Sequence, residues 1–288
     1  MPTAVSKSFA DLLERLVPDG PPPRAAEAQR RALDKALRSD LGAIQWVPAG
    51  SVRTRTNVKG HSPIDLLVVL RGEPVQSSST AALRWFAGRV ADALSSVETA
   101  VDSSAVVAPF GPGKANRHRF IPAPLLELGE HGSEVYGIPD GEGGWMRTSP
   151  ALHDRYLDDR DRRAEATVRP LVRFVKAWKH LNDVPVSSYY LELVTAAHVA
   201  RHRNLSYTQA LAEIVQDLRQ RRLAPVNDPA CVSGSVDPFK HMFHRVRVLD
   251  AVGQGLEHIA AARAAARTND VDEAIDRWNR FFNGAFPG

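Results

Sequence analysis

The stretch "AGSVRTRTNVKGHSPIDLLVVL", residues 49–70, decides how this chain is interpreted. It joins a glycine–serine pair to an apolar run that holds a single carboxylate. Glycine adopts backbone torsions closed to other residues, so Gly50 allows a tight turn. In such a turn, backbone N–H groups and the Ser51 hydroxyl can approach an anion closely. The pair predicts a phosphate-binding loop, although an ordinary strand-to-helix turn explains the same two residues.

The apolar run at residues 63–70 predicts a short buried strand. Asp65 lies inside it, and a buried carboxylate needs a partner or a ligand because burying an unpaired charge is costly. Enzymes that transfer phosphoryl groups with two metal ions carry two acids at spacing two, on one face of a strand. Here the first of those positions is Pro63, so the strand offers one carboxylate.

The rest of the chain divides into a mixed front half and a helical back half. Apolar residues at helical spacing predict helices, and short β-rich runs predict strands. We expect helices at 6–17, 25–42, 80–97, 163–182, 187–203, 207–222, 238–266 and 270–282, with strands at 43–50, 63–70, 97–111 and 118–128. Residues 130–161 are expected to form a loop.

Composition limits the classes of function. The net charge of +4 over 288 residues does not by itself indicate nucleic-acid binding. Basic runs at 201–203 and 219–222 fit solvated helix ends better than a nucleic-acid interface. The single cysteine, Cys231, excludes an internal disulfide and fits a reducing compartment. The first residues lack the apolar core of a signal peptide, and no apolar run is long enough to span a membrane. We therefore expect a cytoplasmic protein.

Further motifs follow the loop in order and carry a family resemblance. They are Gly50-Ser51, Thr56, Lys59-Gly60, "SPID" at 62–65, "RFIPA" at 119–123, Tyr136, "IPD" at 138–140, "GW" at 144–145, "TSP" at 148–150, "RPLVRFVKAWK" at 169–179, "VSSYYLEL" at 186–193 and "FFNGAFPG" at 281–288. Together they resemble the bacterial cGAS/DncV-like nucleotidyltransferases (CD-NTases of the SMODS type). Members of that family make cyclic oligonucleotide second messengers in antiphage defence. The match runs nearly end to end.

The resemblance implies an α+β fold: a polymerase-β-like nucleotidyltransferase core, with a small mixed sheet and flanking helices, plus a C-terminal helical lobe. It implies N-terminal helices over 1–42 that pack on both lobes, the core over 43–155 and the helical lobe over 156–288. A nucleotide is expected in the cleft between the lobes.

By resemblance, the nucleotide-binding residues are Gly50, Ser51, Lys176, Ser188, Tyr189 and Arg119. Helical spacing alone does not choose between Lys176 and Lys179, and only the resemblance selects Lys176. Ser188 also fits the start of a helix, where side chains cap backbone N–H groups.

The three carboxylate positions of the family fall on Pro63, Asp65 and Arg119, so their formal charges here sum to zero. A guanidinium about 4 Å from a divalent ion opposes it by several kcal/mol even at an effective dielectric of 20. We expect Asp65 to be a vestigial catalytic residue and a poor metal ligand. It is expected to pair with Arg119, unless Arg119 faces a ligand phosphate instead. Mg²⁺ is expected only if the protein is active.

Four other side chains are considered as substitute ligands: His61, His118, Asp102 and Glu127. Histidine is a poor ligand for Mg²⁺, and His118 should face away from Arg119 on an alternating strand. Asp102 and Glu127 need a strand register that the sequence does not establish.

Three hypotheses about function follow. The first is a catalytically degenerate protein that binds a nucleoside triphosphate or cyclic oligonucleotide in signalling. The second is an active nucleotidyltransferase with a rearranged metal site. The third is a scaffold for a protein partner. Retained phosphate contacts favour the first hypothesis over the third, and Pro63 and Arg119 favour it over the second.

Overall fold

The computed structural model describes residues 3–41, 44–71, 78–113, 115–129, 132–202, 205–239 and 241–288. Parts of several predicted elements, at residues 42, 43, 130, 131, 203 and 240, lie outside them. The chain divides into two compact units. The sheet unit comprises Asp19–Arg155 and Pro229–Ser233, and the helical unit comprises Met1–Pro18, Tyr156–Asp228 and Gly234–Gly288. The predicted α+β fold class is confirmed. The three-part segmentation stays a prediction.

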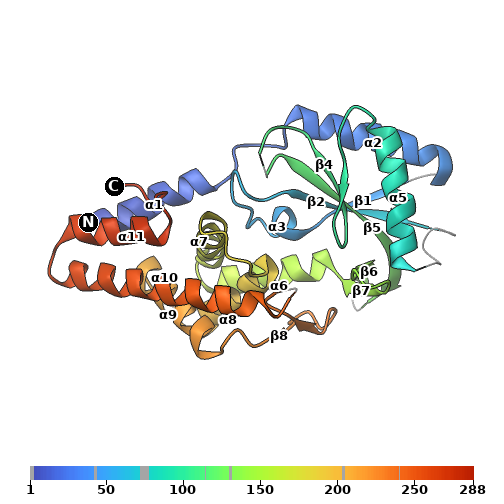
Figure 1. The fold of residues 1–288 in the computed structure, drawn as a ribbon. Coiled ribbons are helices and arrows are strands. Elements are labelled where there is room, and N and C mark those ends of the chain that lie inside the picture. The colour runs from blue at the N-terminus through green and yellow to red at the C-terminus, as the bar shows by residue number, and fades with distance from the viewer. Residues whose placement is uncertain are drawn as a thin grey trace. The chain divides into compact units, whose positions relative to one another are not determined.

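A mixed sheet forms the centre of the sheet unit (Figure 1). Its central strand order is β1-β2-β5-β4-β3, with β6 paired to β5 and β7 paired to β6. β2 runs parallel to β5, and the other pairs are antiparallel. The bounds are β1 (Gln45–Pro48), β2 (Ile64–Leu70), β3 (Ala100–Val101), β4 (Val106–Pro109), β5 (Arg117–Leu128), β6 (Glu134–Pro139) and β7 (Trp145–Thr148).

Side-chain alternation along β2 separates two apolar clusters. Leu66, Val68 and Leu70 pack with buried residues of α2 (Arg24–Leu41) and α5 (Ser79–Ala93). The intervening residues Leu67 and Val69 pack in a second cluster that includes Ala49, Ile121 and Tyr136. Because successive residues of a strand face opposite sides, Asp65 lies on the face of Leu67 and Val69. The helices α2 and α5 therefore cover the face opposite to Asp65.

The predicted loop at 130–161 is wrong for most of its length. It contains β6, β7 and α6 (Pro150–Arg163). Of the fourteen residues of α6, Leu157 is the apolar side chain that is almost fully buried, at 1% exposed, so a search for apolar periodicity finds no signal. The predicted strand at 97–111 is two short strands, β3 and β4, and the predicted helix at 238–266 begins only at His244.

An aromatic cluster forms part of the core of the helical unit. Phe9 packs edge-on against Phe174, Trp278 and Phe286, with ring centroids 5.3, 5.0 and 4.8 Å apart. The first helix is therefore held by the "FFNGAFPG" segment at 281–288. The bounds are α1 (Ala4–Leu16), α7 (Val168–Leu181), α8 (Ser188–Arg201), α9 (Tyr207–Gln220), α10 (His244–Arg267) and α11 (Val271–Phe281), with a small hairpin of β8 (Val226–Asn227) and β9 (Ser235–Val236).

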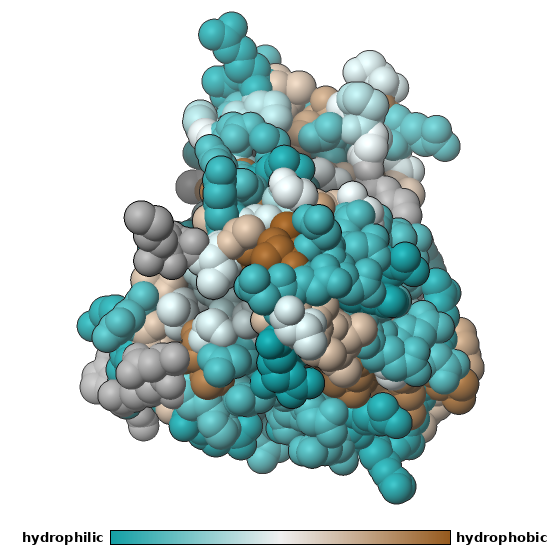
Figure 2. All heavy atoms as spheres, turned by 90° about the vertical axis from the view of Figure 1, so that its left-hand side faces the viewer, coloured by the Kyte–Doolittle hydropathy of each residue, from teal (hydrophilic) through white to brown (hydrophobic). Residues whose placement is uncertain are grey.

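Among the described residues, no helix combines the length and apolar character needed to cross a membrane. The longest helix, α10, has 24 residues and carries charged side chains along its length. On the face of the molecule drawn in Figure 2, hydrophobic residues form patches separated by hydrophilic ones.

Candidate functional site

The glycine–serine loop of the sheet unit lies directly against Asp65. Gly50 begins the short helix α3 (Gly50–Arg53) with φ +54°, a left-handed conformation that favours glycine. The backbone N–H of Ala49 donates to the carbonyl of Asp65 over 3.0 Å. A side chain at Gly50 would overlap the Asp65 carboxylate. The loop therefore requires glycine at this position for two independent reasons, a positive φ and a close approach.

Arg119 pairs with Asp65, as the sequence analysis expected. The parallel register of β2 and β5 sets these residues side by side. The Arg119 Nη1 donates to Asp65 Oδ1 over 2.8 Å. Its Nε donates to Asp102 Oδ2 over 3.0 Å, and its Nη2 donates to the Ser104 hydroxyl over 3.2 Å. All three guanidinium nitrogens are thus engaged by one cluster, which we call the Arg119 clamp: Arg119, Asp65, Asp102 and Ser104.

Asp102 is positioned for this role by its own turn. Its Oδ1 accepts hydrogen bonds from the backbone N–H groups of Ser104 and Ala105, each over 2.9 Å. Those bonds close the turn between β3 and β4, and the pairing of Val107 with Arg119 brings the turn beside β5. The sequence did not establish the register between β4 and β5, so it could not predict that Asp102 contacts Arg119. The structure therefore adds Asp102 to the candidate site.

The charges in the clamp support one another. Burial alone would lower the pKa of Arg119, but the charges of Asp65 and Asp102 outweigh it and raise that pKa. Burial alone would raise the pKa of Asp102, but the Arg119 charge and the N–H groups of Ser104 and Ala105 lower it. The guanidinium therefore stays charged at neutral pH, and the clamp carries a formal charge of −1 from its two carboxylates and one guanidinium.

This arrangement does not fit a pair of Mg²⁺ ions. Hard divalent cations need a shell of oxygen ligands. The two carboxylates of the clamp, Asp65 and Asp102, both form ion pairs with Arg119. At about 4 Å and an effective dielectric of 20, a guanidinium repels a divalent ion by roughly 8 kcal/mol. Pro63, immediately before β2, offers no carboxylate.

The other substitute ligands considered from the sequence lie elsewhere. His118 faces away from Arg119, as the alternation predicted: it is 2% exposed, and its Nδ1 contacts Gln29 of α2 at 3.1 Å. Burial lowers the pKa of His118 to about 4, so it is neutral at physiological pH. Glu127 forms an ion pair with Arg147 of β7. His61 lies in the turn that precedes β2.

In the helical unit, the start of α8 meets the side chain of Lys179. Ser187 caps α8 by accepting a hydrogen bond from the N–H of Tyr190. Ser188 follows, and its hydroxyl accepts from Lys179 Nζ over 2.7 Å. Burial, together with the charge of Lys176, lowers the pKa of Lys179 to about 8. A helix N-terminus with a nearby lysine is suited to a phosphate group.

Lys176, the lysine selected by resemblance, lies deeper. Its side chain is 2% exposed, and its Nζ lies 2.5 Å from Glu192 Oε2 on α8. A buried ion pair of this kind holds its partners firmly, because separating them leaves a buried charge. Of the two lysines, Lys179 therefore contacts Ser188 at the start of α8, whereas Lys176 is held by Glu192.

Tyr189 is held by its hydroxyl. The Tyr189 hydroxyl donates to Asp228 Oδ1 over 3.1 Å. Burial, followed by the charge of Asp228, raises the pKa of Tyr189. The tyrosine therefore stays a neutral hydrogen-bond donor, and its hydroxyl is held by a residue 39 positions away that no sequence motif indicated.

Comparisons with known proteins find sequence relatives of one kind. No family model matches the chain. The chain is 21% identical to a probable cyclic nucleotide synthase, IK1_05630, of Bacillus cereus (strain VD146) over 271 residues, covering 83% of this chain and 81% of that protein. It is 24% identical to a cyclic AMP-AMP-AMP synthase of Acinetobacter sp. over 177 residues, covering 52% of this chain and 49% of that protein.

Solved structures share the fold along the whole chain. CdnC of E. coli MS115-1, solved with ATP, has a TM-score of 0.76 at 19% identity, with 99% of both chains covered. The same protein in complex with HORMA-deltaN has a TM-score of 0.74. Apo DncV of Vibrio cholerae has a TM-score of 0.67 at 15% identity, with 99% of this chain and 80% of that chain covered.

Proposed function

We propose that this chain, a cGAS/DncV-like nucleotidyltransferase by sequence resemblance and by fold, binds a nucleotide or cyclic oligonucleotide without ordinary two-metal catalysis. Its role is that of a sensor, sink or regulatory subunit in cyclic-oligonucleotide signalling, in the antiphage setting of that family. A nucleoside triphosphate is the simplest ligand, since CdnC was solved with ATP.

The Arg119 clamp carries the proposal that catalysis is lost. In a two-metal mechanism, carboxylates hold divalent ions that activate the attacking hydroxyl and neutralise the leaving group. Here the clamp sets the Arg119 cation beside Asp65, the single carboxylate left at the three family positions, and all three guanidinium nitrogens are hydrogen-bonded. Asp65 thus becomes a structural anchor for Arg119 and a vestige of the catalytic set.

Two sets of residues support retained binding. In the sheet unit, Gly50 has a positive φ and Ser51 follows it in α3, and backbone N–H groups in such a turn can approach an anion. In the helical unit, Ser188 and Lys179 form a hydrogen-bonded pair at a helix N-terminus, and Tyr189 follows them on α8. We assign the phosphate contact to Lys179 and a structural role, in its buried ion pair with Glu192, to Lys176.

Calorimetry with ATP, with and without EDTA, tests the binding. We expect saturable binding that is nearly indifferent to EDTA. It should weaken at least tenfold in Lys179→Met and less in Arg163→Met, a matched change at an exposed basic residue elsewhere in the helical unit. Binding that disappears with EDTA contradicts the proposal.

Incubation with labelled nucleoside triphosphates, Mg²⁺ or Mn²⁺ and candidate activators tests the loss of catalysis. We expect no phosphodiester product. A product that forms in the wild type and disappears in Asp65→Asn overturns the degenerate assignment.

One observation favours an active enzyme as the second candidate. Asp102 stands beside Asp65, so a movement of Arg119 toward a ligand phosphate would leave two carboxylates for Mg²⁺. In that case Asp102→Asn abolishes the product, although sequence resemblance gives Asp102 no role. A product that the wild type forms and Asp102→Asn does not form supports the active enzyme. The absence of product in the wild type supports the degenerate protein, so this assay separates the two candidates.

A protein partner is a further proposal. CdnC, which shares this fold, was solved in complex with HORMA-deltaN. We propose that this chain, as a scaffold or as a regulated binder, also binds a protein partner. Co-purification of a defined partner that is unaffected by Lys179→Met would favour the scaffold hypothesis over nucleotide binding.

A further inference from the structure

Two histidines and a glutamate converge at the C-terminal end of α8. His198 and His202 lie one helical turn apart, and their rings stack with centroids 4.6 Å apart. Glu213 of α9 contacts His198, with 3.2 Å between His198 Nε2 and Glu213 Oε2. One ligand atom from each of the three side chains lies within 4.8 Å of the others. We call these residues the His-His-Glu cluster.

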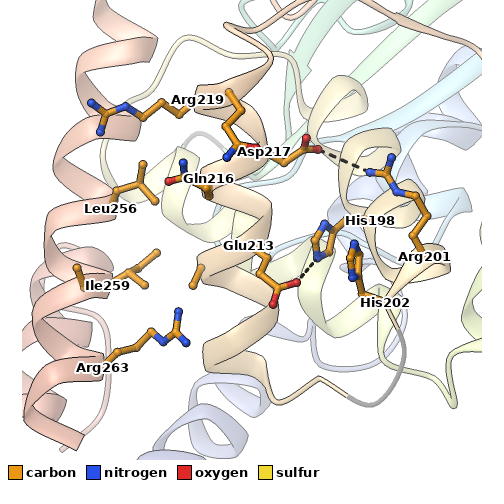
Figure 3. A pocket seen from close by; sticks show the side chains of 13 residues that line it. His198, Arg201, His202, Glu213, Gln216, Asp217, Arg219, Leu256, Ile259 and Arg263 are labelled. Carbon is orange, nitrogen blue, oxygen red and sulfur yellow. Dashed lines mark hydrogen bonds and ion pairs between the residues drawn. The ribbon is translucent and has the colours of Figure 1, made fainter. Parts of the chain in front are cut away.

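The cluster forms part of the wall of a cavity of about 720 Å³, which α8, α9 and α10 line (Figure 3). Ile259 and Leu256 of α10 also line it. The next acid on α9, Asp217, is paired with Arg221 at 2.8 Å and lies 3.9 Å from Arg201. The cavity therefore leaves room beside the His-His-Glu cluster, while the neighbouring carboxylate is already neutralised.

We propose that the His-His-Glu cluster binds one transition-metal ion, with Zn²⁺ as the best fit. Two imidazole nitrogens and one carboxylate oxygen form a ligand set typical of zinc, and three protein ligands leave a fourth position for water. That position faces the cavity. Mg²⁺ fits poorly because it prefers oxygen ligands. This metal is thus chemically distinct from the one a nucleotide would bring.

The geometry needs only a small adjustment. Ligand atoms about 2.1 Å from a tetrahedral ion lie roughly 3.4 Å apart. The largest separation here is within 4.8 Å. Glu213 is 42% exposed, and His202 is exposed, so both side chains can move toward His198, which is buried. The hydrogen bond between His198 and Glu213 already sets two of the three ligands in place.

A hydrogen-bonded pair alone explains His198 and Glu213 and leaves His202 only stacked on the ring of His198. A metal ion uses all three side chains, because each imidazole can offer a nitrogen lone pair and the glutamate a carboxylate oxygen. Such an ion would join the end of α8 to α9. The sequence analysis considered residues 201–203 only as a basic run, because the spacing of His202 and Glu213 is set by the packing of two helices.

Cobalt titration of the full-length protein after treatment with a chelator tests the site. We expect one equivalent of Co²⁺ to bind with the strong visible absorption of a low-coordinate ion, and Zn²⁺ to displace it. Binding should weaken at least tenfold in His202→Ala and in Glu213→Gln. Glu257→Gln, a matched change at an exposed glutamate of α10 outside the cavity lining, should bind as the wild type does.

Circular dichroism of each variant shows whether the fold is kept, which we expect because neither His202 nor Glu213 is buried. Failure of the wild type to bind Co²⁺ saturably at micromolar concentration overturns the proposal. Equal binding by the wild type, His202→Ala and Glu213→Gln overturns it as well. Both results are independent of nucleotide binding, so the metal site and the proposed function are tested separately.

Discussion

The pKa of Lys179 predicts that nucleotide affinity falls as the pH rises from 7 to 9. In the free protein, burial and the charge of Lys176 lower this pKa to about 8. A phosphate beside Lys179 favours the charged ammonium, so binding raises the pKa. The bound state therefore holds a proton that the free protein loses above pH 8. By linkage, affinity is nearly constant at pH 7 and below, and it declines as the pH rises through 8.

The size of the effect follows from the same value. With a pKa of about 8, roughly 90% of Lys179 is neutral at pH 9 and roughly 10% at pH 7. If binding moves the pKa well above 9, the affinity drops about tenfold between pH 7 and pH 9, or about 1.4 kcal/mol. At pH 8, binding takes up about half a proton per nucleotide. Tyr189 does not contribute, because its raised pKa keeps it neutral over this range.

Calorimetry at pH 7, 8 and 9 measures the affinity, and two buffers of different ionisation enthalpy at pH 8 measure the proton uptake. Lys179→Arg should bind with an affinity that does not change over this range, because arginine stays charged. Lys179→Met should bind weakly at every pH. Affinity of the wild type that is independent of pH, with no proton uptake, would refute the assignment of the phosphate contact to Lys179.

The same pKa predicts a stability effect that serves as a control. The folded-state pKa of about 8 lies below the ordinary value of 10.5. The unfolded state therefore binds more protons between pH 8 and pH 10.5, so stability rises with pH across that interval. At pH 7, Lys179→Met should raise the free energy of unfolding by about 2–3 kcal/mol in urea titrations. Weak nucleotide binding by this variant is then not a consequence of unfolding.

Three further substitutions test the two units. Arg119→Met leaves Asp65 and Asp102 without their cation, so it should lower the free energy of unfolding by about 2–3 kcal/mol. The loss is smaller than for a fully buried ion pair because all three side chains are partly exposed. Mn²⁺ should then raise the Tm of this variant and not that of the wild type, whereas equal shifts would contradict the clamp. Gly50→Ala should cost at least about 2 kcal/mol in thermal unfolding because of its positive φ and its overlap with Asp65; an unchanged Tm would contradict the close approach. Phe9→Ala should lower the free energy of unfolding by about 3–5 kcal/mol in urea titrations, because it leaves a cavity in the aromatic cluster. A loss below about 1 kcal/mol would show that Phe9 does not pack tightly in this cluster.

The fold was predictable where apolar side chains set the pattern. β2 was recognised because five consecutive apolar residues, 66–70, follow Asp65, and α7 because its apolar face recurs at helical spacing. α6 was missed because charged side chains dominate it and ion pairs such as Arg163 with Asp159 lie along its surface. β6 and β7 were missed because a hairpin's pairing depends on its partner strand and not on its own periodicity.

The candidate site was predictable only as far as single strands determine it. Alternation along β5 was enough to direct His118 away from Arg119, whereas the family resemblance brought Arg119 together with Asp65. Asp102 depends on the register between β4 and β5, which no local pattern encodes. The choice between Lys176 and Lys179 depends on how α7 packs against α8, because both lysines lie near the same edge of the helix.

The aromatic cluster around Phe9 has a consequence for synthesis on the ribosome. Phe9 is made 277 residues before its partner Phe286. At about 5–20 residues per second, the interval is roughly 14–55 s. Residues 19–155 of the sheet unit are complete well before that. During this interval the nascent chain lacks Phe286, so the apolar face of α1 is not fully covered. Chaperones that recognise short apolar segments can bind α1 during that time.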